Sequence, residues 1–241
     1  MLPEKPSTSS HPPRHLPDAT TQDSRLPASH TTSTAELARL KISLHKSLRQ
    51  FPDFPSPGIL FEDILPLFSD PTLHEALIKA LELHVKTNYS EGQRPDVIIG
   101  LEARGLLFGP SLALRLGAGF VPVRKQGKLP GPTETASYKK EYGEDFFQIQ
   151  ADAIKPGQKV LVVDDIIATG MNYVQEILRQ HWLISNTGGS AAAAGSLVTK
   201  LGGILLGYVF ILELYFLKGR EKLDAPVYTL LSSQEDGPAK T

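Results

Sequence analysis

The stretch of residues 160–170 carries the side chains whose types and spacing best support chemistry. Four apolar residues lead to Asp164 and Asp165, and an Ala168-Thr-Gly170 turn follows two apolar residues later. Carboxylate oxygens at a strand end suit sugar hydroxyls or a hydrated Mg²⁺. A Thr-Gly turn before a helix suits phosphate, because free N–H groups and the helix dipole point at the anion. A pair of acids that caps the next helix explains the same spacing, so both interpretations stay open.

Basic and aromatic side chains elsewhere are weaker candidates for binding. Arg124, Lys125 and Lys128 gather on a stretch rich in Gly and Pro, where a run of charges is usually a solvated loop. Arg104 precedes an expected helix, a position where a cation opposes the helix dipole and therefore needs another partner. Phe61, taken by itself, is most simply a core residue.

The elements that position these residues alternate between strands and helices. Apolar runs predict strands over residues 59–65, 96–100, 120–124, 159–165 and 204–212. Helical spacing and caps predict a helix from Thr34 to residue 49, and others over 71–87, 105–116 and 190–201. This alternation implies a parallel sheet with right-handed crossovers. Ligands of such sheets gather at the carboxyl ends of the strands.

The composition excludes several classes of protein. The 241 residues carry a net charge of −1, which argues against bulk nucleic acid or an anionic membrane as a partner. The absence of Cys excludes a disulfide framework, a thiolate metal site and a cysteine nucleophile. The most apolar stretch, residues 204–217, is interrupted by Gly207 and Glu213, so no transmembrane helix is expected.

The two ends of the chain differ from its middle. Residues 1–35 are rich in Pro, Ser and Thr and hold no aromatic residue, so we expect a disordered tail. The folded domain is expected over residues 36–232, and residues 233–241 are expected to be a flexible C-terminal tail.

Six motifs in order carry a resemblance to a known family. The 160–170 stretch resembles the phosphoribosyl-diphosphate (PRPP) signature of type I phosphoribosyltransferases, and residues 47–232 resemble adenine phosphoribosyltransferases as a whole. The other motifs begin with Phe51-Pro-Asp-Phe-Pro-Ser-Pro-Gly, Gly100-Leu-Glu-Ala-Arg-Gly, Arg124-Lys-Gln-Gly-Lys-Leu-Pro-Gly, Ser137-Tyr-Lys-Lys-Glu-Tyr-Gly and Leu217-Lys-Gly-Arg-Glu-Lys-Leu. The charges of the last motif are most simply structural.

The resemblance implies a fold and a reaction. The fold is an α/β type I phosphoribosyltransferase fold, a mostly parallel twisted sheet flanked by helices, with a small hood and a mobile lid loop. The reaction is adenine + PRPP → AMP + pyrophosphate with Mg²⁺, in purine salvage. A homodimer in the cytoplasm is also implied, with no nucleic acid or membrane partner.

The resemblance also assigns roles to individual residues. Asp164 and Asp165 would hold the ribose hydroxyls and, through water, the Mg²⁺ ion, which has no direct protein ligand. The phosphate would bind at Ala168, Thr169, Gly170, Gly189 and Ser190. Arg104, with the backbone around Ala103, would grip pyrophosphate. The adenine would lie between the backbone of Leu60 and the ring of Phe61.

The remaining assignments concern the lid. Arg124, Lys125 and Lys128 lie on the stretch that resembles the lid, which excludes water from the transition state. Glu141 matches the residue that transfers a proton to the adenine ring, and Tyr142 lies beside it on the same excursion. An ordinary surface charge explains Glu141 equally well.

Two departures from the family pattern are visible. Glu62 occupies a position where relatives often carry a basic residue. In the larger departure, residues 171–188 separate Ala168-Thr-Gly170 from Gly189-Ser190, which are continuous in the family. Codons for Gly170-Met-Asn can contain a donor-like GTATG, and those for residues 185–188 can contain a branch-like CTAAC and an acceptor-like ACAG. Removal between them keeps the frame, so we interpret the insertion as a retained intron that impairs activity; a genuine lineage-specific insertion is the alternative.

Other functions fit parts of the pattern. A PRPP-sensing regulator, a PRPP-binding variant without activity, and a phosphoribosyltransferase for xanthine or orotate are the alternatives. The proline-rich motif from Phe51 and the Lys128-Leu-Pro-Gly stretch favour adenine among the bases. A regulator would need a DNA-binding domain or a basic face, which residues 1–35 do not offer.

Overall fold

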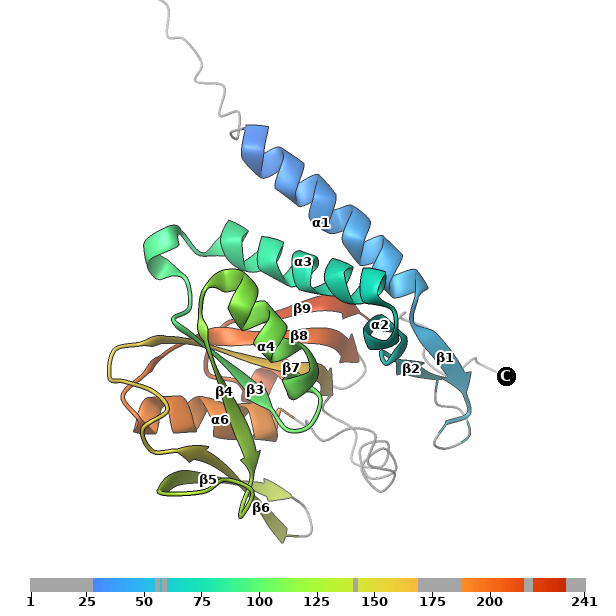
Figure 1. Ribbon diagram of the computed structural model, residues 1–241. Helices are drawn as coiled ribbons and strands as arrows, with labels where there is room; N and C mark the ends of the chain where they lie inside the picture. The colour runs from blue at the N-terminus through green and yellow to red at the C-terminus, as the bar shows by residue number, and fades with distance from the viewer. Residues whose placement is uncertain are drawn as a thin grey trace, which may run out of the picture.

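A twisted seven-stranded sheet is the centre of the molecule (Figure 1). The computed structural model describes residues 28–54, 57, 60–140, 143–168, 188–214 and 219–232. Within them the strand order is β5-β6-β4-β3-β7-β8-β9. The strands are β3 (Val97–Leu101), β4 (Gly119–Lys125), β5 (Thr133–Lys140), β6 (Gly143–Gln150), β7 (Lys159–Ala168), β8 (Ile204–Leu214) and β9 (Val227–Ser232).

The sheet is mostly parallel, as the sequence predicts. β4, β3, β7, β8 and β9 pair in parallel, and all five residues of β3 are buried. Strands buried on both faces read as continuous apolar runs, which is why the sequence located β3 and β7. The β5–β6 hairpin adds two antiparallel strands at the β4 edge.

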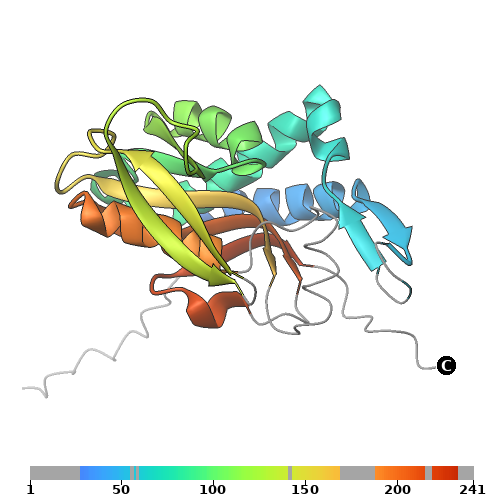
Figure 2. The same cartoon turned by 90° about the horizontal axis from the view of Figure 1, so that it is seen from below.

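Helices cover both faces of the sheet. α3 (Pro71–Asn88) and α4 (Gly105–Leu116) cover one face, α1 (Ala28–Lys46) packs along α3, and α6 (Gly189–Lys200) covers the other face (Figures 1 and 2). The short helical turns are α2 (Pro66–Ser69), η1 (Glu91–Gln93) and η3 (Gly219–Lys222). No helix within the described ranges is long and apolar enough to cross a membrane.

α3 forms where its cap and apolar spacing predict. Asp70 caps α3 by accepting hydrogen bonds from the N–H groups of Thr72 and Leu73 at 2.7 and 3.0 Å. Leu77, Leu81 and Val85 form an apolar stripe at helical spacing and are fully buried in the core that α3 shares with the sheet. The stripe therefore supplies the core on the α3–α4 side.

A two-stranded antiparallel sheet forms the expected hood. It consists of β1 (Arg49–Pro52) and β2 (Leu60–Asp63), with Phe51 opposite Phe61. Both views place it beyond the carboxyl ends of β7, β8 and β9 (Figures 1 and 2). The hood thus faces the edge of the sheet where ligands of parallel sheets bind.

One expectation about the elements was wrong, and four strands were not predicted. The first helix begins at Ala28 rather than at Thr34, so residues 28–35 of the expected tail are helical. Residues 133–150, for which no element was predicted, contain the β5–β6 hairpin. β1 and β9 were not predicted either. The first 27 residues and residues 233–241 lie outside the part of the chain that the structure describes.

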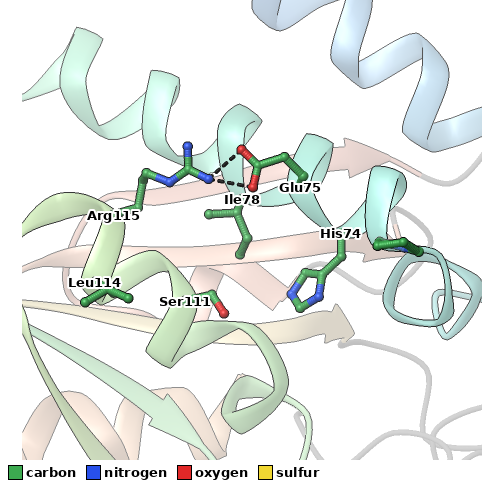
Figure 3. A pocket seen from close by; sticks show the side chains of 7 residues that line it. His74, Glu75, Ile78, Ser111, Leu114 and Arg115 are labelled. Carbon is green, nitrogen blue, oxygen red and sulfur yellow. Dashed lines mark hydrogen bonds and ion pairs between the residues drawn. The ribbon is translucent and has the colours of Figure 1, made fainter.

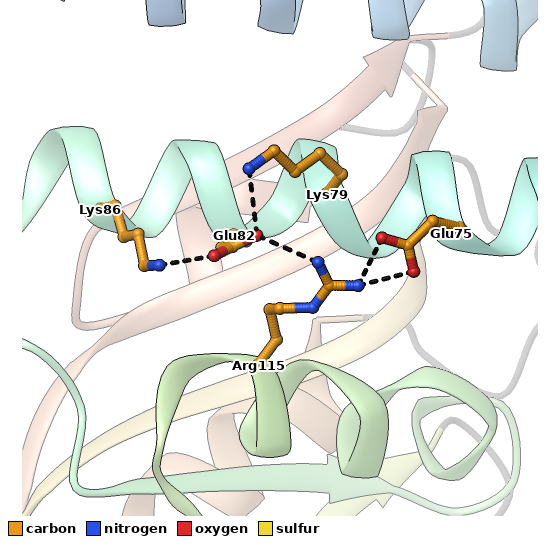
Figure 4. Close-up of polar contacts among 5 residues, drawn as sticks. All are labelled: Glu75, Lys79, Glu82, Lys86 and Arg115. Carbon is orange, nitrogen blue, oxygen red and sulfur yellow. Dashed lines mark hydrogen bonds and ion pairs between the residues drawn. The ribbon is translucent and has the colours of Figure 1, made fainter.

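Two charged clusters hold elements together. Glu82 of α3 is 5% exposed and pairs with Lys86 and Lys79 on its own helix and with Arg115 of α4 (Figure 4). Glu75 accepts two bonds from Arg115 at 2.5 and 2.6 Å. The second cluster joins β8 and β9 to η3, with hydrogen bonds from Arg220 to Glu213 and Thr229. The structural interpretation of the charged motif from Leu217 is confirmed for Arg220.

A stack of two rings joins α3 to β9, and a lysine of α1 lies over it. The His84 ring of α3 lies 3.3 Å from the Tyr228 ring of β9 at an interplanar angle of 8°. Lys41 of α1 lies 5.2 Å from the centre of the same Tyr228 ring. Burial and, to a smaller extent, the Lys41 charge lower the pKa of His84 to about 4. His84 is therefore neutral at pH 7.

We expect His84 to make the fold sensitive to acid. His84 gains a proton near pH 6.5 in the unfolded chain but only at about pH 4 in the folded chain. The contribution of neutral His84 to the free energy of unfolding is therefore complete above pH 6.5 and is lost as the pH falls from 6.5 to about 4. The difference between the two pKa values corresponds to roughly 3 kcal/mol of unfolding free energy. In His84→Gln, which does not titrate, urea denaturation should show a smaller loss of unfolding free energy between pH 7.5 and 4.5. An unchanged loss would contradict this role.

Candidate active site

The carboxyl ends of β3 and β7 bring together the acids and the arginine that the sequence singled out. β3 and β7 are hydrogen-bonded neighbours, and Gly100 of β3 pairs with Val163 of β7. The loop after β3 therefore lies beside Asp164 and Asp165. Arg104 Nε lies 2.7 Å from Asp165 Oδ2.

Asp164 holds the start of α4. Its Oδ1 accepts a hydrogen bond from the Gly105 N–H at 3.1 Å and from the Asp165 N–H at 2.9 Å. A Cβ at position 105 would lie 2.7 Å from the Val163 carbonyl oxygen, so only glycine permits this approach. Asp164 thus caps a helix, as the alternative interpretation held, but the helix is α4 rather than the one that follows β7.

Both acids are buried, which the sequence interpretation did not foresee. Asp164 and Asp165 are each 1% exposed, whereas side chains that simply face a ligand would be open to solvent. Burial and the neighbouring Asp165 charge raise the pKa of Asp164 well above its usual range. Burial also raises the pKa of Asp165, and the Arg104 charge counteracts part of that effect. The pair therefore resists carrying two negative charges at once.

Arg104 connects the acids to a cavity under the hood. Its backbone occupies the N-cap position of α4, and its side chain is 21% exposed. A cation at this position is unfavourable beside the helix dipole, and the pair with Asp165 offsets that cost. The residue before it, Ala103, is exposed in the same loop.

The cavity is apolar and has a volume of about 270 Å³. Phe54 and Phe61 meet edge to face in its wall with ring centres 5.5 Å apart, and Phe51 lies 6.2 Å from Phe54. Arg104 and Ile166 form the side nearest the sheet. Aromatic walls with a few polar groups are typical of sites for flat heterocycles. Leu60 is 42% exposed next to Phe61.

The basic cluster lies at the end of β4. The Arg124 guanidinium donates to Glu102 through Nε and Nη2, at 3.2 Å each, and through Nη1 to the Lys128 carbonyl oxygen at 3.3 Å. Lys125 and Lys128 are exposed. The cluster lies beside the β3–α4 loop, because Glu102 belongs to that loop.

The structure describes only part of the set of residues that the sequence analysis expects to bind phosphate. Ala168 ends β7 opposite Leu214 of β8, and Gly189 and Ser190 begin α6, where Ser190 is 1% exposed. Thr169 and Gly170 lie outside the described residues, as do Glu141 and Tyr142. No group of three or more His, Cys, Asp or Glu able to hold a metal ion occurs among the residues that are described.

A larger cavity is lined by none of these residues. It has a volume of about 490 Å³ and lies between α3 and α4, with His74, Ser111 and Arg115 in its wall (Figure 3). The smaller cavity adjoins the strand ends and is the better candidate site.

Sequence reasoning missed several residues of the site. Glu102, Phe54 and Ile166 were given no role, although each belongs to a motif noted above. No local sequence signal located Glu102: it lies beside Arg124 because Leu101 pairs with Val123 in the register of β3 and β4, which only the structure shows.

Comparisons with known proteins agree with this geometry. Residues 72–181 match the family model of the phosphoribosyl transferase domain. The chain is 59% identical over 199 residues to the adenine phosphoribosyltransferase of Yarrowia lipolytica, covering 83% of this chain and 99% of that protein. It is 53% identical to the Candida albicans enzyme of the same name, covering 83% and 95%.

Solved structures give the same answer. The crystal structure of Saccharomyces cerevisiae adenine phosphoribosyltransferase, complexed with an imino-altritol bisphosphate and adenine, has a TM-score of 0.70 at 54% identity and covers 80% of this chain and 99% of that chain. The Rhodothermus marinus adenine phosphoribosyltransferase structure has a TM-score of 0.66 at 40% identity, covering 81% and 99%.

The fold is that of a type I phosphoribosyltransferase. At these levels of identity and coverage, the chain belongs to the adenine phosphoribosyltransferase family.

We expect Asp164→Asn to stabilise the fold at alkaline pH. The amide keeps an acceptor oxygen for the Gly105 N–H but carries no charge. Because burial raises the pKa of Asp164, its favourable contribution is complete below the ordinary pKa of Asp and is lost as the pH rises. The variant should therefore have a higher free energy of unfolding than the parent at pH 8, and the gain should be smaller at pH 5. Melting curves at both values measure this, and a gain that grows toward acid pH would contradict it.

Proposed function

We propose that this chain transfers the phosphoribosyl group of PRPP to adenine, giving AMP and pyrophosphate. The carrying observation is the meeting of Arg104 and the Asp164–Asp165 pair with an aromatic cavity at the carboxyl ends of β3 and β7. Basic, acidic and apolar groups thus meet at one place, as a substrate with a diphosphate, a ribose and a base requires. The family membership supports adenine as the base.

The base fits the cavity under the hood. We propose that the adenine ring stacks on Phe61 and that the backbone of Leu60 recognises its edge. The apolar wall of Phe51, Phe54 and Phe61 supports this assignment. Ile166 closes the cavity directly after the acid pair, so a base bound there lies beside the ribose site.

The diphosphate fits the cations around the β3–α4 loop. Arg104 and the backbone at Ala103 lie on one side, and Arg124, Lys125 and Lys128 lie at the end of β4. The contacts of Arg124 with Glu102 and with the Lys128 carbonyl support a common site. Guanidinium groups suit this task because they donate parallel hydrogen bonds to phosphate oxygens.

The ribose and its 5′-phosphate fit the ends of β7 and α6. Asp164 and Asp165 would accept hydrogen bonds from the ribose hydroxyls, and the phosphate would bind at residues 168–170 with Gly189 and Ser190. Support comes from the position of both acids in β7 directly after Val163, the last β7 residue paired with β3, and from Gly189 at the start of α6. The buried charges of the acids gain a partner when hydroxyl groups bind.

Magnesium fits the donors at this site. Mg²⁺ prefers hard oxygen ligands, which substrate oxygens and water would supply, and the two adjacent carboxylates would hold that water. The ion would be held near Asp164 and Asp165 without a dedicated set of protein ligands. When bound, it neutralises charge on the diphosphate leaving group.

A spectrophotometric assay tests the activity. The full chain is incubated with PRPP, Mg²⁺ and adenine, hypoxanthine, xanthine or orotate in turn. We expect AMP formation from adenine alone. Turnover of another base would contradict the assigned specificity, and PRPP binding without turnover would favour a non-catalytic variant. Asp165→Asn should reduce turnover far more than it lowers the melting temperature.

Proton transfer to the base is assigned to Glu141. A carboxyl group at the N7 edge of adenine can donate or accept a proton once the lid excludes water. We expect Glu141→Gln to lower kcat with a smaller effect on adenine affinity. An unchanged kcat would remove Glu141 from this role and leave Tyr142 as the neighbour to test.

We further propose that residues 171–188 impair this chain and derive from a retained intron. The family-model match ends at residue 181, inside this segment, which supports an interruption. A version without residues 171–188 should turn over PRPP faster than the full chain. Equal activity would contradict the impairment, and a survey that finds no transcript shorter by 18 codons would contradict the intron.

The assembly and location are proposed on the same basis. We propose a homodimer in the cytoplasm. Leu107 and Leu114 of α4 are 45% and 85% exposed, and a second copy could cover them. Gel filtration with light scattering tests the dimer, and cell fractionation tests the location.

A further inference from the structure

Each arginine assigned to the diphosphate is already paired with a carboxylate of the protein. Arg104 pairs with Asp165, and Arg124 pairs with Glu102. The first pair belongs to the acid cluster described above. The functions assigned so far give no role to Glu102 in the Glu102–Arg124 pair. The geometry of this pair indicates such a role.

Glu102 occupies the binding edge of Arg124. Its two carboxylate oxygens accept from Nε and Nη2 of Arg124, and Oε2 also accepts from the Lys125 N–H, each at 3.2 Å. The Nε–Nη2 edge of a guanidinium is one that binds carboxylate or phosphate through two parallel bonds. An anion that uses this edge of Arg124 must therefore displace Glu102.

The pair is loose compared with similar pairs in the chain. Arg115 donates to Glu75 at 2.5 and 2.6 Å (Figure 4), and Arg220 donates to Glu213 at 2.7 and 2.6 Å. Charge-assisted bonds of this kind are about 2.7–2.9 Å long. Of these three pairs, the one at Glu102 is the longest, which is the property that an exchangeable partner needs.

The carboxylate is charged and reachable. Burial by itself would raise the pKa of Glu102, but hydrogen bonds from the Arg124 side chain and the Lys125 N–H, with the Arg124 and Lys128 charges, outweigh it and lower that pKa. The side chains of Glu102 and Arg124 are 21% and 34% exposed. A solvated anion can thus reach the pair, and Glu102 competes with it as an anion at neutral pH.

We propose that Glu102 is a positioning residue. Its carboxylate binds the Arg124 guanidinium while no diphosphate is bound, and it competes with the diphosphate for that guanidinium. This inference rests on the proposed phosphoribosyl transfer, which supplies the diphosphate. A protein molecule binds the anion fully only when Arg124 is released from Glu102. The Glu102–Arg124 pair therefore lowers the apparent affinity for diphosphate. Glu102 therefore favours release of the pyrophosphate product and keeps Arg124 oriented between turnovers.

The test compares pyrophosphate binding by the full chain and its variants. Isothermal titration calorimetry with magnesium pyrophosphate is used, so the readout does not depend on turnover. Glu102→Gln keeps the size and the acceptor oxygen of the side chain but removes its charge. We expect about two- to fivefold tighter binding, the range that a partly exposed ion pair can withhold. Pyrophosphate should also become a stronger product inhibitor.

Two further variants separate competition from other effects. In an Arg124→Gln background, Glu102→Gln should leave the pyrophosphate affinity unchanged, because the competition acts through Arg124. Glu75→Gln, which alters an Arg–Glu pair on the helices away from the strand ends, should also leave it unchanged (Figure 4). Melting curves confirm that each variant is folded.

The outcomes are distinct. Equal or weaker pyrophosphate binding by Glu102→Gln overturns the proposal. Tighter binding both with Arg124 present and in the Arg124→Gln background also overturns it, because Glu102 would then only repel the anion by its charge. Absence of pyrophosphate binding in every variant also overturns it. A chain that shows the expected affinities but forms no AMP contradicts the proposed function and leaves this inference supported.

Discussion

The hydrogen bond from the Gly105 N–H to the Asp164 carboxylate is the contact on which the site depends. It joins residues 59 positions apart, one in the second half of β7 and one at the start of α4, and both partners are buried. The bond fixes where α4 begins, and the β3–α4 loop must then pass beside the acid pair. Arg104 reaches Asp165 from that loop, and Glu102 reaches Arg124 from the same loop. One buried carboxylate thus positions groups from three strands.

This arrangement is a compromise between stability and chemistry. Two adjacent buried carboxylates repel each other and lose hydration, which is why their pKa values are raised. Arg104 offsets part of that cost for Asp165. A ligand with hydroxyl groups and a bound divalent cation would offset more, so the binding of substrate removes a strain that the fold carries. Such perturbed acids are typical of functional sites.

The sequence predicted the elements whose signals are local. β3 and β7 are buried on both faces, so their apolar runs are continuous, and α3 carries a complete buried stripe. The β5–β6 hairpin was missed because residues 133–150 mix polar and apolar side chains after a Pro-rich stretch. The start of α1 was misplaced because Thr34 resembles a cap while lying inside the helix.

The sequence predicted which residues belong to the candidate site more reliably than it predicted their burial and their contacts. Asp164 and Asp165 were found from their spacing, but their burial follows from the approach of Gly105, which no local pattern announces. The aromatic cavity needs Phe51 and Phe61 to face each other across β1 and β2, and β1 was not predicted. The Glu102–Arg124 pair needs the register of β3 and β4. Each miss concerns a contact between distant segments.

The distinction between local signals and contacts of distant segments also explains how an insertion can spare the fold and still harm activity. β7 keeps its pairing with β8 as far as Ala168, and α6 begins regularly at Gly189, with the Ala192 N–H donating to the Gly188 carbonyl. Lengthening a loop from about 5 to about 23 residues costs only about 1–1.5 kcal/mol of closure entropy. A phosphate cradle is more demanding, because three or four charge-assisted bonds of roughly 1.5–3 kcal/mol each require both halves of the turn in one place. Residues 171–188 separate the two halves of the proposed phosphate site in sequence. In that proposal, the closure entropy that the sheet tolerates would be a direct loss of ligand affinity.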